Sequence, residues 1–103
     1  MDKESVIKLT RHYLSKVKAT DIEVSEAWLF GSFARGNAHE NSDIDLAIVL
    51  AGNNNSFDIE VKLMTLRKGE ETLIEPHPFN KDEFKLDSPI VYQIVHSGQK
   101  LKL

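Results

Sequence analysis

Two short apolar segments constrain the fold of this chain more than any other feature. Residues 24–30 end in four consecutive apolar side chains, Ala27 to Phe30, and residues 44–50 are apolar almost throughout. Apolar runs without polar alternation are typical of strands that are covered on both faces. We therefore predict a central strand at Val24–Phe30 and a second strong strand at Ile44–Leu50.

The segments around these strands predict helices and a further strand. The chain has 103 residues, which is enough for one small domain. Helix caps, apolar spacing and turn residues predict the remaining elements. These are a helix from a cap at Asp2 to about Lys18, a short turn at Phe33–Gly36, a helix at Phe57–Lys68 with Ser56 as its N-cap, a short strand at Thr72–His77, a turn after Asn80, a helix from Pro89 to Gly98 and a strand in the tail. The predicted class is α/β (α+β), a small mixed β-sheet with helices packed on it.

The segment Phe57–Lys68 carries two conflicting signals. Apolar residues alternate with charged ones, as in a strand, but the segment is long and Gly69 provides a helix stop. We predict a helix with two apolar sides. One side would pack on the sheet, and the other would be available to a partner protein.

Composition excludes several classes of function. There is no cysteine, so disulfides, zinc–thiolate sites and thiol catalysis are excluded. The formal net charge is −3, which argues against an extended nucleic acid as partner. The longest apolar run is too short to cross a bilayer, and the charged amino end is followed by no signal-peptide core, so a cytoplasmic location and no membrane contact are expected.

Two carboxylates stand at the start of the second strand. Asp43 and Asp45 are two residues apart, and alternate residues of a strand share a face. Carboxylate oxygens at this spacing suit Mg²⁺, which completes its shell with water and phosphate. An Asp-x-Asp pair alone is a weak signal, because such pairs often begin strands that bind no metal.

A second feature lies at the end of the first strand. Gly31-Ser32 follows Phe30 and opens a short helical turn. Glycine allows a phosphate to approach the backbone, and the amides and the Ser32 hydroxyl are donors for an anion. An ordinary strand-to-helix turn would look the same, but the two features together predict a triphosphate bridged by Mg²⁺.

These motifs resemble a known signature. Gly-Ser-Phe-Ala-Arg-Gly at residues 31–36, a polar spacer, and Ser-Asp-Ile-Asp-Leu at residues 42–46 resemble the DNA polymerase β-like nucleotidyltransferase superfamily. The chain is most similar to the smallest members, the MNT-type (minimal nucleotidyltransferase) domains, which implies one such domain over residues 1–103. The resemblance covers Val24–Leu50 well and the later segments more loosely.

The resemblance implies roles for particular residues. Gly31 and Ser32 would hold the triphosphate of ATP or another nucleoside triphosphate, and Asp43 and Asp45 would hold two Mg²⁺ ions. In the family a third carboxylate on a later strand completes the metal site and helps to activate the attacking hydroxyl. Glu75 is the only acidic residue of the predicted strand at 72–77, although the family more often has aspartate there.

Two further residues have alternative interpretations. Arg35 is expected either to contact phosphate or to pair with a nearby carboxylate. His77 would share the face of Glu75, where it could contact metal or phosphate, although an exposed imidazole is the more common situation.

Three functions are compatible with this pattern. The first is transfer of a nucleoside monophosphate, AMP from ATP, to a hydroxyl. The chain lacks a recognisable acceptor-binding module, so the acceptor would come from a partner or lie between subunits of a homo-oligomer. Family resemblance implies a helical HEPN toxin as partner, with AMP added to its tyrosine. The alternatives are a non-catalytic antitoxin that acts by contact and, least favoured, a metal-dependent phosphodiesterase.

Overall fold

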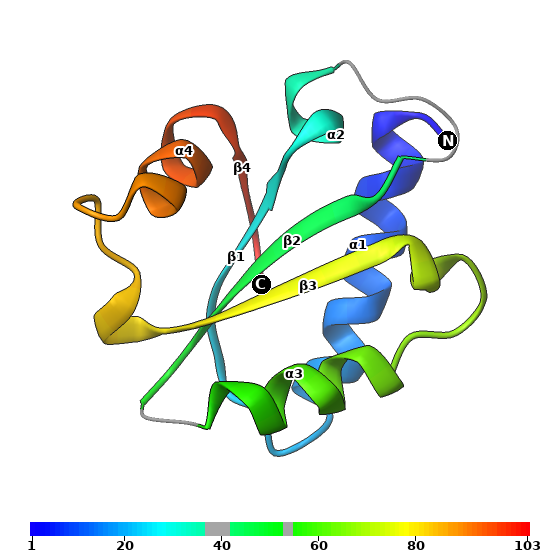
Figure 1. Ribbon diagram of the computed structural model, residues 1–103. Coiled ribbons are helices and arrows are strands. Elements are labelled where there is room, and N and C mark those ends of the chain that lie inside the picture. Colours follow the sequence, from blue (N-terminus) through cyan, green and yellow to red (C-terminus); the bar gives the residue numbers. More distant parts are fainter. Residues whose placement is uncertain (37–41, 53–54) are drawn as a thin grey trace.

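The computed structural model describes residues 1–36, 42–52 and 55–103. The predicted polar spacer and the asparagine loop therefore lie largely outside the described residues. The elements run in the order α1 (Lys3–Lys18), β1 (Val24–Phe30), α2 (Ser32–Arg35), β2 (Ile44–Leu50), α3 (Ser56–Thr65), η1 (Gly69–Leu73), β3 (Ile74–Asn80), η2 (Lys81–Glu83), α4 (Pro89–Ser97) and β4 (Gln99–Leu101), where η marks a short 3₁₀ helix (Figure 1).

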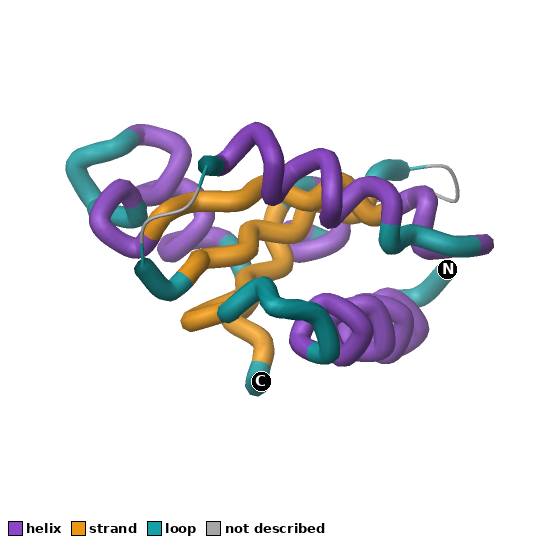
Figure 2. The backbone as a smooth tube through the Cα atoms, turned by 90° about the horizontal axis from the view of Figure 1, so that it is seen from below, coloured by secondary structure: helices purple, strands orange, loops and turns teal. Residues whose placement is uncertain are grey.

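The strands form one mixed sheet in the order β3-β2-β1-β4. Strand β1 is antiparallel to both β2 and β4, whereas β2 and β3 are parallel. The two most apolar strands occupy the centre, as the sequence predicts for β1. Figure 2 shows the strands as a twisted layer with the helices around it. The mixed α/β class is confirmed.

The main core lies between one face of the sheet and the helices α1 and α3. Even-numbered residues of β2, including Leu46 and Ile48, are fully buried in it, together with Tyr13 of α1 and Leu63 of α3. The Tyr13 hydroxyl donates a hydrogen bond to the carbonyl of Leu63, which joins the two helices. Burial raises the pKa of this hydroxyl well above its usual value, so Tyr13 stays protonated and remains a donor.

A smaller apolar cluster covers part of the opposite face. Phe30, Ala47 and Ile94 of α4 are buried there, and Trp28 and Phe84 pack against them. Helix α4 begins as predicted, with Pro89 in its first turn after Ser88, and ends at Ser97 with Gly98 as its C-cap. This face is the one onto which the odd-numbered residues of β2 project, so it also carries Asp45.

Four predicted boundaries are wrong, the two ends of α3 and the two ends of β3. Helix α3 ends at Thr65 and not near Lys68, and its N-cap is Asn55, whose side chain accepts hydrogen bonds from the backbone of Phe57 and Asp58. Residues 72–73 belong to η1, and β3 continues to Asn80 through both prolines. No helix in the described part of the chain is long and apolar enough to cross a membrane.

Candidate active site

The turn after β1 has a backbone that favours glycine. Gly31 has φ +79° and ψ −154°, in a region that other residues rarely adopt. A Cβ built at this position would lie 2.3 Å from Oδ2 of Asp45. The absence of a side chain at Gly31 therefore allows the Asp45 carboxylate to lie directly against the turn that leads into α2.

The orientation of Asp45 follows from the burial of its neighbours. Ile44 and Leu46 are fully buried in the main core, which directs Asp45 to the opposite face. Its Cα partner in the antiparallel pair is Phe30, the last residue of β1. Asp43, one residue before the strand begins, is exposed and shares the parity of Asp45. The register thus places Asp45 beside the Gly31–Ser32 turn, with Asp43 two residues before it in the chain.

Glu75 lies in the neighbouring strand at the same level. It is the Cα partner of Asp45 in the parallel pair, so the two side chains emerge on the same face of the sheet. Its neighbours Ile74 and Pro76 are buried, whereas Glu75 is exposed. Glu75 therefore lies on a strand, as predicted, although β3 begins later than predicted.

His77 contacts Asp45 directly. Its Nε2 lies 3.1 Å from Oδ1 of Asp45, and both side chains are partly exposed. The imidazole also packs against Phe30, with ring centroids 5.2 Å apart. The sequence indicated that His77 and Glu75 share a face, but only the register, in which His77 pairs with Ala47, brings the imidazole to Asp45.

The remaining predicted residues lie on or near the short helix α2. Ser32 begins the helix and is half-buried, whereas Arg35 in its last turn is exposed. The structure therefore brings Gly31, Asp45 and His77 into contact and places Ser32 next to them in the chain. Arg35 points to solvent at the other end of the turn.

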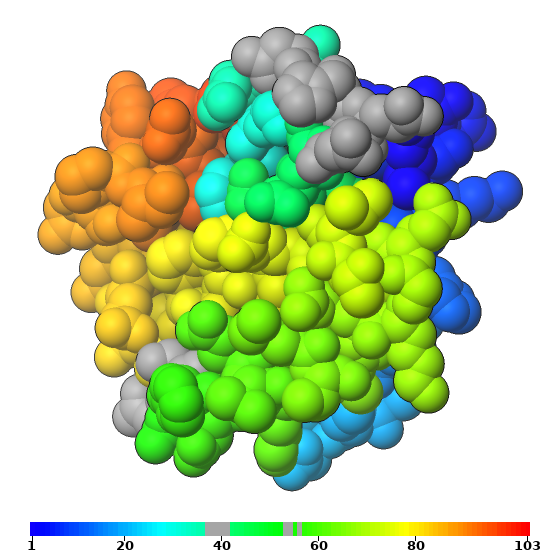
Figure 3. All heavy atoms as spheres, turned by 45° about the vertical axis from the view of Figure 1, so that its right-hand side comes forward, coloured from blue at the N-terminus to red at the C-terminus, as the bar shows by residue number. Residues whose placement is uncertain are grey.

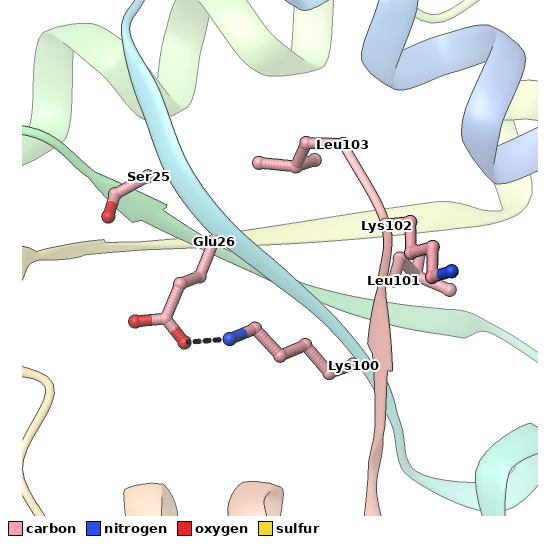
Figure 4. A pocket seen from close by; sticks show the side chains of 6 residues that line it. All are labelled: Ser25, Glu26, Lys100, Leu101, Lys102 and Leu103. Carbon is pink, nitrogen blue, oxygen red and sulfur yellow. Dashed lines mark ion pairs between the residues drawn. The ribbon is translucent and has the colours of Figure 1, made fainter.

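A separate pocket of about 530 Å³ lies near the opposite end of β1 (Figure 4). It is lined by Ser25, Glu26 and residues 100–103, and Lys100 Nζ lies 3.5 Å from Glu26 Oε1 across it. None of the predicted site residues lines this pocket. The candidate active site is therefore the open face around Asp45 and not this hollow.

A glycine turn after a central strand, with Asp45 on the adjacent strand and Asp43 just before it, is the arrangement that the resemblance to nucleotidyltransferases implies. The family described as Polymerase beta, Nucleotidyltransferase matches residues 12–102 of the chain. The chain belongs to this family, which confirms the predicted membership and makes nucleotidyl transfer the class of reaction that its site supports.

Solved structures agree with this assignment. A proposed nucleotidyltransferase from Sulfolobus solfataricus is 25% identical, with a TM-score of 0.66 over 79% of this chain and 72% of that one. The toxin–antitoxin complex MntA–HpeT, solved as a mutant with two aspartates changed to glutamate, contains a chain that is 21% identical. It has a TM-score of 0.51 over 99% of this chain and 73% of that one, and it shows the shared fold. No curated protein matches the chain at a significant level.

Proposed function

We propose that this domain transfers AMP from ATP to a hydroxyl group in a Mg²⁺-dependent reaction that releases pyrophosphate. The observation that carries the proposal is the contact between two motifs that are separate in sequence. The carboxylate of Asp45 lies against Gly31, so a phosphate held at the Gly31–Ser32 turn would lie beside a metal-binding oxygen.

The chemistry of the predicted side chains suits Mg²⁺, but they do not form one cluster. Within residues 1–36, 42–52 and 55–103, no three His, Asp or Glu side chains lie close enough together to hold a metal ion, so Asp43, Asp45 and Glu75 are not gathered as the resemblance implies. Mg²⁺ commonly takes only one or two carboxylates and completes its shell with water and substrate phosphate. Asp43 and Asp45 supply these oxygens, and Glu75 lies one strand away at the same level.

Each residue then has a defined task. Backbone amides at Gly31 and the Ser32 hydroxyl would hold the triphosphate, and Asp43 and Asp45 would hold the two metal ions. Bound Mg²⁺ would neutralise phosphate charge and stabilise the leaving pyrophosphate. Arg35 lies within the same motif and is assigned to phosphate, since its exposed guanidinium is free to reach a ligand at the turn.

Glu75 is the proposed base. Its carboxylate would accept the proton of the acceptor hydroxyl as the oxygen attacks the α-phosphorus of ATP. A new O–Pα bond forms, the bond from Pα to the bridging oxygen breaks, and pyrophosphate departs with the electron pair. The exposure of Glu75 is consistent with this role, because the acceptor must approach from solvent.

The first experiment is a calorimetric titration of the protein with ATP, with and without Mg²⁺. Tight binding is expected only when Mg²⁺ is present, and the double variant Asp43→Asn/Asp45→Asn should lose it. Incubation with α-labelled ATP and a candidate acceptor then measures transfer. Metal-independent binding, or binding that survives the double substitution, would contradict the proposal.

We further propose a helical HEPN-type toxin as acceptor and partner. Similarity to the MntA–HpeT toxin–antitoxin chain supports an antitoxin role. A surface for the partner is available on α3, where Phe57, Val61 and Met64 are 71%, 46% and 45% exposed along one side of the helix. In Figure 3 helix α3 lies on the surface of the face shown there. Co-purification followed by mass spectrometry of the partner for added AMP tests both claims.

The second candidate function is neutralisation by contact alone, without transfer. The exposed apolar side of α3 favours it, because Ile59 and Leu63 on the other side already satisfy the core. Asp43→Ala separates the two functions. If the variant still neutralises the partner, contact suffices; if neutralisation is lost while the complex still forms, catalysis is required.

A homo-oligomer with the site between subunits would appear as a larger particle in light scattering.

A further inference from the structure

The two carboxylate oxygens of Asp45 have different neighbours. Oδ1 lies 3.1 Å from Nε2 of His77, whereas Oδ2 is the atom closest to the position of a Cβ on Gly31. The carboxylate is therefore held between β3 on one side and the turn after β1 on the other. One oxygen faces an imidazole, and the other faces the turn that would hold the phosphates.

The imidazole itself is held in place. Pro76 and Pro78 flank His77 and fix their own backbone φ near −65°, which stiffens this part of β3. The ring of Phe30 packs against the imidazole, with the ring planes at 59°. Because the backbone of Phe30 pairs with Asp45, the same residue aligns both partners of the contact.

The chemistry of the pair fixes the direction of the hydrogen bond. An ionised carboxylate only accepts hydrogen bonds, so the nitrogen that faces it must carry hydrogen. We propose that His77 is a positioning residue, whose Nε2–H donates to Oδ1 of Asp45 and keeps Oδ2 directed at the Gly31–Ser32 turn. This role rests on the proposed function, in which Asp45 holds a metal ion.

Such a partner changes metal affinity without touching the metal. Loss of a hydrogen bond to a metal-binding group commonly weakens metal binding by about 10- to 100-fold. His77→Leu removes the donor and keeps an apolar side chain against Phe30. His77→Gln places an amide N–H near the position of Nε2. His96→Gln is the matched control, because His96 is exposed on α4, where its ring hydrogen-bonds to the carbonyl of Tyr92 and stacks on the Tyr92 ring in the same helix.

The first measurement uses the metal-free protein. Nitrogen-15 NMR of the wild type at mildly basic pH should show His77 with hydrogen on Nε2, and Asp45→Ala should shift that resonance. A His77 with hydrogen on Nδ1 only, and with Nε2 free, would overturn the positioning role. This readout needs neither nucleotide nor activity, and it uses the folded wild type.

The second measurement is the affinity for Mn²⁺ in the presence of a non-hydrolysable ATP analogue, which electron paramagnetic resonance detects. His77→Leu should weaken Mn²⁺ affinity about 10- to 100-fold, His77→Gln should recover most of it, and His96→Gln should match the wild type. Wild-type affinity in His77→Leu, or a nitrogen coordinated directly to Mn²⁺, would overturn the positioning role alone. Failure of the wild type to bind Mn²⁺ with the analogue would instead overturn the proposed function, and this role with it.

Discussion

Gly31 and Asp45 are in van der Waals contact across the turn between β1 and α2, and any side chain at Gly31 would displace the carboxylate. A Cβ there would lie 2.3 Å from Oδ2, 3.2 Å from Cγ and 3.3 Å from Cβ of Asp45. The flexible end of Asp45 can move away from such a clash. A substitution at Gly31 should therefore change the position of the Asp45 carboxylate more than it lowers the free energy of unfolding.

Gly36 provides a matched control for this prediction. Its φ of +78° matches that of Gly31, although its ψ of 13° places it in the left-handed helical region, and no atom of the described residues lies within 4 Å of a Cβ built on it. Backbone strain should lower the free energy of unfolding by about 1–2 kcal/mol in Gly36→Ala and by about 1–3 kcal/mol in Gly31→Ala. Only Gly31→Ala should abolish Mg²⁺-dependent ATP binding. Calorimetry and urea unfolding of both variants measure this, and equal loss of binding in the two would refute it.

Asp43→Asn and Asp45→Asn should separate function from folding. Each removes one charge from the proposed metal site and should lower the transfer rate by about two orders of magnitude or more. Both side chains are at least partly exposed, so the free energy of unfolding should change by only about 0.5 kcal/mol. Asp82→Asn, an exposed aspartate in η2, is the control. Transfer at the wild-type rate in Asp45→Asn would contradict the proposed role of Asp45 at the metal site.

The first and last residues of the two central strands could be predicted because each segment is apolar along most of its length, which indicates burial on both faces. Val24–Phe30 and Ile44–Leu50 are the observed bounds of β1 and β2. No comparable signal exists for β3, where the two prolines indicated either an edge strand or a strand end. They are tolerated because β3 is an edge strand. Arg67 donates a hydrogen bond to the carbonyl of Ile74 from the open edge of β3. Because the backbone groups of alternate residues point to the same side of a strand, the nitrogens of Pro76 and Pro78 also face this open edge.

The site was predictable in its motifs but not in its contacts. The spacing of Asp43 and Asp45 and the Gly31-Ser32 turn follow from sequence, because each is local. The contact of His77 with Asp45 depends on the register of β3 against β2, which is set by the connection between them. Alternation alone could place His77 on the right face, but it could not place it opposite Ala47.

Glu71 should make stability depend on pH. Burial disfavours its charged form, but hydrogen bonds from Lys16 Nζ and from the Lys68 backbone, with the Lys16 charge, outweigh this and hold the pKa below its ordinary value of 4.5. When the pKa of a carboxyl is lower in the folded than in the unfolded state, the group adds stability at any pH above its unfolded-state pKa. That stability is lost as the pH falls through the folded-state pKa. The protein should therefore weaken as the pH falls below about 4.5, as the folded carboxylate takes up a proton.

Glu71→Gln tests that dependence. At neutral pH the variant removes the negative charge that faces the Lys16 ammonium, which also donates to the carbonyl of Leu66 2.8 Å away, and should lose about 1–3 kcal/mol of unfolding free energy. The difference from the wild type should shrink as the pH falls below 4.5. Urea unfolding at several pH values measures it. Glu70→Gln, an exposed neighbour in the same 3₁₀ helix, is the control, and a difference that stays constant with pH would contradict the assignment.

The two sides of α3 should respond to substitution in opposite ways. Leu63 is fully buried in the main core, whereas Val61, two residues earlier, is 46% exposed on the outer side. Leu63→Ala should lower the free energy of unfolding by about 2–5 kcal/mol, because it removes buried apolar contacts and leaves a cavity. Val61→Glu together with Met64→Glu should change it by about 0.5 kcal/mol or less per site.

Partner binding should respond in the opposite way from stability: the double glutamate variant should lose it and Leu63→Ala should keep it. The double glutamate variant places two charges where the proposed partner would bury the apolar side of α3, so complex formation should be lost while ATP binding is retained. Leu63→Ala, at a temperature where it remains folded, should still bind the partner because its outer surface is unchanged. Co-purification and calorimetry on the same preparations measure both properties. If the double variant still captures the partner, the outer side of α3 is not the interface, and the antitoxin surface must lie on another element.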